Sequence, residues 1–172
     1  MSRTAMTLAI LSAILMGAPA QASAPQTVEA STTPTRTGTP ASAEERAAYD
    51  RLDALSRSLF WSHQFEIDAT DPVAGVKAAQ ALRELGRYEQ AAETARRTLI
   101  VQPDNTGAMM EVGRAQIARG QAFYGIASLE RAMALAPDDW RPLSLLGIAY
   151  QQVERTAEAR DIWNRGLILS PD

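Results

Sequence analysis

A regular repeat interval organises the second half of this chain. The same interval separates Pro103 from Pro137 and Pro137 from Pro171, and it also separates Gly113 from Gly147. A repeat of about 34 residues holds two helices joined by a short turn, and one such unit cannot bury its apolar face alone. The chain is therefore expected to be all-α, with helical pairs stacked into a linear solenoid.

The repeat predicts three units, each made of a first and a second helix, over residues 72–105, 106–139 and 140–172. Each unit is preceded by a residue of the type that caps helices, because its side chain accepts hydrogen bonds from the free N–H groups of the first turn. These residues are Asp71, Asn105 and Asp139. Pro72 follows Asp71 at a position where its missing N–H has no cost.

The third unit carries the strongest motif. Its residues resemble the W-x2-L-G-x2-Y…A-x3-F…P spacing of tetratricopeptide repeats (TPR). The matching residues are Leu143, Leu146, Gly147, Tyr150, Ala159, Trp163 and Pro171. The fold class that this resemblance implies is an α-solenoid of helix–turn–helix TPR units.

Residue size along the units predicts how the helices pack. Small residues are expected where the two helices of a unit approach closely, and these are Ala79, Gly113, Gly147, Ala91, Gly125 and Ala159. Larger side chains on the second helices should pack onto the following unit. These are Leu99, Met133 and Leu167, together with Val101, Leu135 and Leu169.

Residues 44–71 are expected to form an N-terminal capping helix or half repeat, with one helix from Glu44 to Ile67. Apolar side chains recur there at helical spacings. Trp61 lies one repeat interval before Ala95, so the end of this helix takes the place of a second helix. No matching first helix is evident before it, and a complete divergent repeat remains the alternative.

The first residues have the layout of a secretory signal. Arg3 precedes an uncharged run rich in Leu, Ile, Met and Ala, and small residues around Ala22 suit signal cleavage. Residues 1–22 are therefore predicted to be a signal peptide. An uncleaved anchor is the alternative, although the run is shorter than the ~20 residues that span a bilayer. Residues 23–43, rich in Thr and Pro, are expected to be a disordered linker.

This layout predicts a periplasmic protein without stable membrane insertion, and a peripheral position at the outer membrane is one option. The apolar faces of Trp163, Leu167 and Leu169 have no following unit to cover them. An open C-terminal end of this kind is expected either to reflect truncation or to dock on a partner, self-association included.

Composition and the lack of certain motifs exclude several classes of function. The chain has no cysteine and only one histidine, His63, which excludes disulfides, Cys-ligated zinc and any site with two imidazoles. A net charge of −3 gives no reason to expect nucleic acid as a partner. The sequence lacks a phosphate-binding glycine loop, G-x-S-x-G and HExxH. We therefore expect no enzyme activity, no cofactor and no metal, with an enzyme subunit as a remote alternative.

The first helices of a helical-pair solenoid line its concave surface, where peptides bind. By repeat position, the predicted lining residues are Val76, Gln80, Arg83, Met110, Arg114, Ile117, Ser144, Ile148 and Gln151. An ordinary solvated face is the alternative. Some TPR proteins hold a C-terminal carboxylate with Lys and Asn at such positions, and this pair is absent from the corresponding positions here.

Three runs of sequence resemble TadD-type proteins, the secreted TPR components of tight-adherence (Flp) pilus assembly in Gram-negative bacteria. The runs cover residues 60–68, 82–88 and 139–143. The resemblance implies a non-enzymatic assembly factor at the outer membrane that assists the pilus secretin by binding a protein or peptide partner. The alternative is a general periplasmic TPR adaptor for another envelope complex, such as cytochrome maturation or cell-wall machinery.

Overall fold

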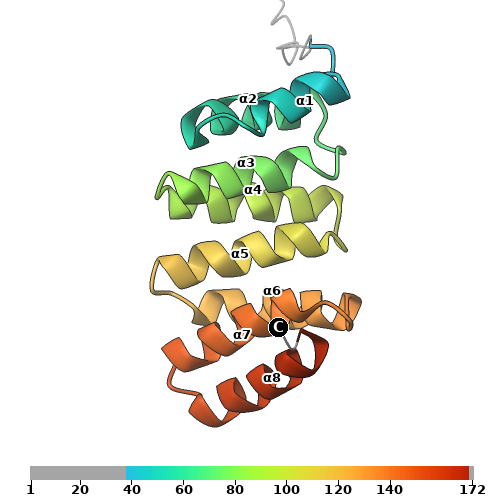
Figure 1. Cartoon of the computed structure of the whole chain (residues 1–172). Coiled ribbons are helices and arrows are strands. Elements are labelled where there is room, and N and C mark those ends of the chain that lie inside the picture. Colours follow the sequence, from blue (N-terminus) through green and yellow to red (C-terminus); the bar gives the residue numbers. More distant parts are fainter. Residues whose placement is uncertain (1–37, 171–172) are drawn as a thin grey trace, which may run out of the picture. The chain divides into compact units, whose positions relative to one another are not determined.

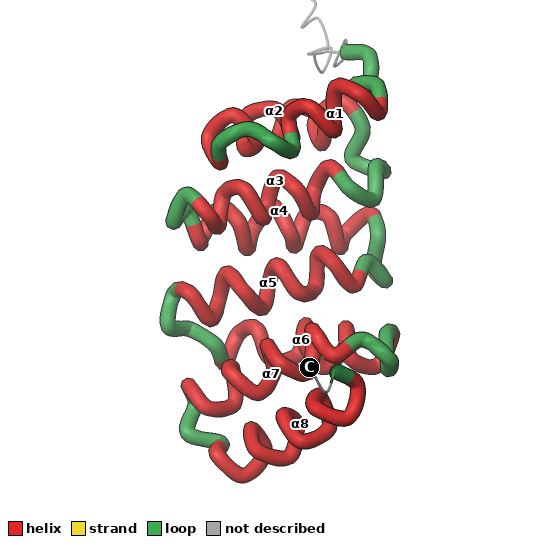
Figure 2. The backbone as a smooth tube through the Cα atoms, viewed as in Figure 1, coloured by secondary structure: helices red, strands yellow, loops and turns green. Residues whose placement is uncertain are grey.

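The computed structural model describes residues 38–170, and within this stretch all regular secondary structure is helical. The helices are α1 Ala43–Tyr49, α2 Ala54–Ile67, α3 Ala74–Glu84, α4 Tyr88–Val101, α5 Thr106–Ala118, α6 Phe123–Leu135, α7 Trp140–Gln152 and α8 Thr156–Leu169. They follow one another as antiparallel pairs in a single stack (Figures 1 and 2). The expected signal peptide, residues 1–22, and most of the expected linker lie outside the described residues.

The helical pairs repeat with the period of the sequence. α5 and α7 begin at Thr106 and Trp140, and α4, α6 and α8 end at Val101, Leu135 and Leu169, so the repeat interval of the sequence separates the members of each set. Each helix packs against the next along the chain from α1 to α8. The expected fold class, an all-α solenoid of TPR-like helical pairs, is confirmed.

Side-chain caps fix the starts of the first helices. Asp71 Oδ1 accepts hydrogen bonds from the backbone N–H groups of Val73 and Ala74, at 2.8 and 3.2 Å. The side chain of Asn105 accepts from the N–H of Ala108 at 2.9 Å, and that of Asp139 from the N–H of Arg141 at 2.9 Å. Asn105 and Asp139 are therefore confirmed as caps, because each satisfies a free donor of the first turn. Asp71 also satisfies donors at the start of α3, but that helix begins at Ala74, two residues later than predicted, with Val73 as its N-cap.

Glycines mark the places where the paired helices touch. A Cβ atom built on Gly113 would overlap the side chain of Leu129 in α6, and one on Gly147 would overlap the indole of Trp163 in α8. A Cβ atom on Gly125 would lie 3.1 Å from the Cα of Gly113. α5 and α6 therefore cross with two glycines facing each other, as the sequence predicts for close helix packing.

Packing between units follows only part of the prediction. Leu99 and Met133 are half-buried and pack against the core. The prediction is wrong for Val101 and Leu135, whose side chains are 44% and 45% exposed. Leu167 and Leu169 lie on α8, the last helix that the structure describes, and are 62% and 38% exposed, so their contact with a following unit stays a prediction. Positions two residues apart on an α-helix point in nearly opposite directions. Leu99 and Val101 therefore cannot both face the following unit.

The N-terminal region contains two helices where one was expected. α1 ends at Tyr49, and Asp53 caps a separate helix α2 by accepting from the N–H groups of Leu55 and Ser56. The indole N–H of buried Trp61 donates to Asp50 Oδ1 at 3.0 Å, which ties the turn between α1 and α2 to the core. α2 occupies the place of a second helix and packs on α3, and α1 is a short helix before it.

The described end of the expected linker is also held in place. Ser42 caps α1 in a reciprocal arrangement with Glu45, and the N–H of Ala41 donates to the Gln64 side chain at 2.7 Å. Arg46 pairs with Asp71 at 2.6 Å, linking α1 to the start of α3. The described helical unit thus begins before residue 43, because the backbone N–H of Ala41 and the side chain of Ser42 find partners on α2 and α1.

Candidate functional site

The predicted lining residues lie on three first helices that are neighbours in space. α3 packs against α5, and α5 packs against α7, so the first helices of successive units form a row. We call the nine predicted residues on this row the first-helix face. They are Val76, Gln80 and Arg83 on α3, Met110, Arg114 and Ile117 on α5, and Ser144, Ile148 and Gln151 on α7.

Eight of these nine side chains are at least partly exposed, and Met110 is the exception. Met110 is only 4% exposed and belongs to one buried cluster with Leu143 and Leu146 of α7. Its long apolar side chain fills the space between α5 and α7 instead of facing solvent. Met110 is therefore a core residue, and the prediction that it contacts a partner is corrected.

A buried carboxylate joins two of the predicted residues. Glu111 on α5 is 1% exposed. Its Oε2 accepts a hydrogen bond from Nε of Arg83 on α3 at 2.9 Å, and its Oε1 accepts from an Nη atom of Arg114 at 2.6 Å. We call these three residues the Arg–Glu–Arg cluster. A buried carboxylate needs such partners, because its desolvation would otherwise be costly.

Gln80 belongs to a second polar cluster on α3. Its Nε2 donates to Glu84 Oε1 at 3.0 Å, and Arg57 from α2 pairs with the same carboxylate. Burial acts to raise the pKa of Glu84, but the hydrogen bonds from Gln80 and Arg57 outweigh it and the pKa is lowered. Glu84 is therefore ionised at neutral pH, and Gln80 is held in place by it.

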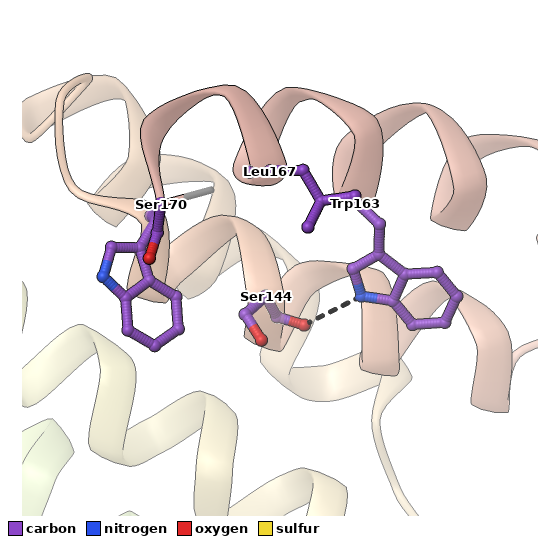
Figure 3. A pocket seen from close by; sticks show the side chains of 6 residues that line it. Ser144, Trp163, Leu167 and Ser170 are labelled. Carbon is purple, nitrogen blue, oxygen red and sulfur yellow. Dashed lines mark hydrogen bonds between the residues drawn. The ribbon is translucent and has the colours of Figure 1, made fainter. Parts of the chain in front are cut away.

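The α7 end of the face borders a hollow of about 400 Å³ between α7 and α8. Its lining residues are Trp140, Ser144, Trp163, Gly166, Leu167 and Ser170. The indole of Trp163 points towards α7 and donates to the backbone carbonyl of Ser144 at 3.4 Å (Figure 3). Trp140 and Leu167 are 46% and 62% exposed, so the hollow has an accessible apolar wall.

Sequence reasoning missed Glu111 and Trp140 as parts of this region. The spacing of Glu111 and Arg114, three residues apart on one helix, is a signal for an ion pair on a helix surface. No sequence pattern pairs Glu111 with Arg83, because Arg83 comes from the preceding unit. Trp140 stands at the start of α7, and in the sequence it belongs to the run of residues 139–143 that resembles TadD-type proteins.

Groups that bind metal do not cluster in the described region. Within residues 38–170, no three His, Cys, Asp or Glu side chains lie close enough to hold a metal ion. His63 lies exposed on α2. None of the helices in the same range is long and apolar enough to cross a bilayer.

Solved structures of MamA share this fold. MamA 41-end from Desulfovibrio magneticus RS-1 superposes with a TM-score of 0.66 at 23% identity, over 74% of this chain and 72% of that chain. The MamA RS-1 ArsTM double mutant gives 0.62 at 24% identity, over 69% of this chain and 66% of that one. A crystal structure of MamA gives 0.62 at 16% identity, over 69% of each chain. At these identities the likeness concerns the fold alone.

Comparisons of the amino-acid sequence do not identify a family. No protein-family model matches the chain, and no curated protein matches it at a significant level.

Proposed function

We propose that this chain is a non-enzymatic TPR scaffold that binds another protein through the first-helix face. The observation that carries the proposal is that three successive units place eight partly exposed side chains on one row of helices. Such a row can contact several residues of one polypeptide segment at once, which is how helical-pair solenoids bind partners.

The chemistry of the face fits a peptide segment. Val76, Ile117 and Ile148 offer apolar contacts, one from each first helix, and Ile148 is 38% exposed. Polar groups of Arg83, Arg114 and Gln151 lie among them. Apolar contact supplies affinity, and polar groups that need a matching partner supply specificity.

Assembly of a tight-adherence pilus is the finer part of the proposal. The three runs that resemble TadD-type proteins support it, and the structure gives those runs clear roles in the fold. Trp61 and Phe65 are buried core residues, and Asp139 caps α7. Gly86 has a φ of 74° in the turn between α3 and α4, a conformation that favours glycine. The partners proposed on this basis are pilus secretin components.

A general periplasmic TPR adaptor remains the second candidate, because the likeness to MamA concerns only the fold. The two candidates differ in their partner. They share the first-helix face and the absence of a catalytic role.

Site-specific photo-crosslinking in the native envelope tests the binding face and the partner together. A photoreactive phenylalanine analogue replaces Ile148, and the control places the same group at Arg96, which is exposed on α4. A partner crosslinked from position 148 and not from position 96 is the expected result. Secretin components support the pilus assignment, whereas cell-wall or cytochrome-maturation proteins support the adaptor. Identical products from both positions would contradict the first-helix face as the binding site.

Export to the periplasm is a separate part of the proposal, supported by the signal layout of residues 1–22. Mass spectrometry of the chain isolated from the periplasmic fraction should give a mature form that begins at Ser23. A chain found only in the cytoplasm with residues 1–22 intact would contradict it.

A further inference from the structure

We propose that Arg83 and Arg114 together bind one acidic side chain of the partner polypeptide. This inference rests on the proposed function, because it states what the first-helix face selects. The Arg–Glu–Arg cluster is the part of the face that carries it.

The cluster holds more positive charge than is required to neutralise its buried carboxylate. Glu111 has one negative charge and lies 1% exposed between two guanidinium groups. One arginine would neutralise it, and the second leaves a surplus of one positive charge. The side chains of Arg83 and Arg114 are 24% and 31% exposed, so this surplus charge is accessible from solvent.

Both guanidinium groups keep free donors. Arg83 uses Nε for Glu111, and Arg114 uses one Nη atom. These are the only hydrogen bonds that the two guanidiniums make within the described residues. A guanidinium carries five N–H donors in a planar fork that matches a carboxylate. Both groups bond to the same carboxylate, and the proposal is that their remaining donors bind one further acidic group.

Neighbouring charges on the first helices are already paired. Lys77 pairs with Asp50 at 2.9 Å, and Arg57 pairs with Glu84. Arg141 makes three hydrogen bonds to Asp139, between 2.7 and 3.0 Å. Arg83 and Arg114 also act on the carboxylates of Glu84 and Asp139 and help to lower their pKa values, but each of these carboxylates has an arginine of its own, Arg57 and Arg141. One positive charge in excess therefore remains at the Arg–Glu–Arg cluster. An acidic residue of the partner gains from it, and a basic residue is repelled.

The shape of this site differs from a clamp for a chain terminus. Its donors come from two neighbouring first helices, which also carry the apolar residues Val76 and Ile117. A segment that crosses the face would place a Glu or Asp side chain at the cluster and apolar side chains on either side. The proposal is therefore a side-chain carboxylate within the segment, and peptide termini form a separate arm of the test.

The test uses the full chain and a synthetic library of short peptides whose two termini are blocked. Peptides retained by the wild type should share one Glu or Asp position next to apolar residues. For a retained peptide, changing that Glu to Gln should raise Kd roughly tenfold, the usual value of a charged hydrogen-bonded contact. The same peptide without its acidic residue but with a free C-terminus should still bind weakly.

Two variants with matched controls locate the effect. R83Q/E111Q/R114Q removes both arginines without leaving a buried unpaired carboxylate, and it should abolish the difference between the Glu and Gln peptides. E111Q frees both guanidiniums and should enlarge that difference. R96Q and E93Q on α4 change net charge by the same amounts as these two variants and should leave the difference unchanged. Circular dichroism verifies that each variant is folded.

The outcomes separate this inference from the function on which it rests. Retained peptides without an acidic preference, or a preference that survives in folded R83Q/E111Q/R114Q, would overturn the inference and leave peptide binding intact. Full recovery of binding by a free C-terminus would overturn it as well, because the site would then recognise chain ends. If the wild type retains no peptide, peptide binding by this face and the inference fail together.

Discussion

The indole ring of Trp163 in α8 lies directly against the backbone of Gly147 in α7. A Cβ atom at position 147 would overlap Nε1 and Cδ1 of that ring. Leu129 lies in the same way against Gly113, one unit earlier. A large side chain on the second helix and a glycine on the first thus form the contact that holds each of these two pairs together.

Gly147→Ala should lower the free energy of unfolding by about 1–3 kcal/mol, because the added methyl group displaces Trp163 from a packed position. Urea unfolding followed by circular dichroism measures the change. Gly166→Ala is the matched control, since its Cβ atom would lie 3.6 Å from the nearest side chain, Leu143. That control should be neutral or slightly stabilising, because alanine favours a helix more than glycine does. Equal losses in both variants would show that the contact with Trp163 is not the cause.

Trp61→Ala should lower the free energy of unfolding by about 3–5 kcal/mol, because the ring is 1% exposed between α2 and α3 and its removal leaves a cavity. The variant also loses the hydrogen bond to Asp50. Leu59→Ala on the same helix, at a position 66% exposed, should change stability by less than about 0.5 kcal/mol. A mild effect of Trp61→Ala would mean that α2 is not an integral part of the stack.

Arg114→Glu should lower the free energy of unfolding by about 3–5 kcal/mol, since it removes a partner of buried Glu111 and adds a like charge beside it. Arg131→Glu reverses the same charge in an exposed pair with Asp104 and should cost less than about 1 kcal/mol. Thermal unfolding of the two variants at neutral pH compares them. Similar midpoints would contradict the burial of Glu111.

Asp139 should make the free energy of unfolding depend on pH in the acidic range. Hydrogen bonding from Arg141 lowers the pKa of Asp139 below its usual value, in spite of partial burial. Its contribution is therefore fully present above the unfolded-state pKa of about 3.9 and is lost as pH falls through the lower folded-state value. Asp139→Asn keeps a capping oxygen and removes the charge.

Urea unfolding at a series of pH values measures this effect. Wild type should exceed Asp139→Asn in stability between about pH 5 and 7, and the difference should shrink below about pH 4. Asp161→Asn, at an exposed position on α8, serves as the control. A difference of constant size at every pH would show that the Arg141 pair does not contribute through charge.

The architecture of this protein follows from signals in its sequence. The period, the caps Asp71, Asn105 and Asp139, and the small residues at 113 and 147 are properties of one helical pair or of its regular repetition. The caps and small residues can be recognised within one repeat, and the period needs only a comparison of successive repeats along the chain. The placement of the first helices in one row follows from that repetition.

The tertiary structure decided how individual side chains are used. Met110 is buried while Ser144, the equivalent position one repeat later on α7, is partly exposed, because α5 has a first helix packed on each side of it in the row. Glu111 pairs with Arg114 on its own helix, but its second partner, Arg83, comes from another unit. Burial and ion pairing depend on which helices pack together in space, and a periodic pattern along one chain does not specify those contacts.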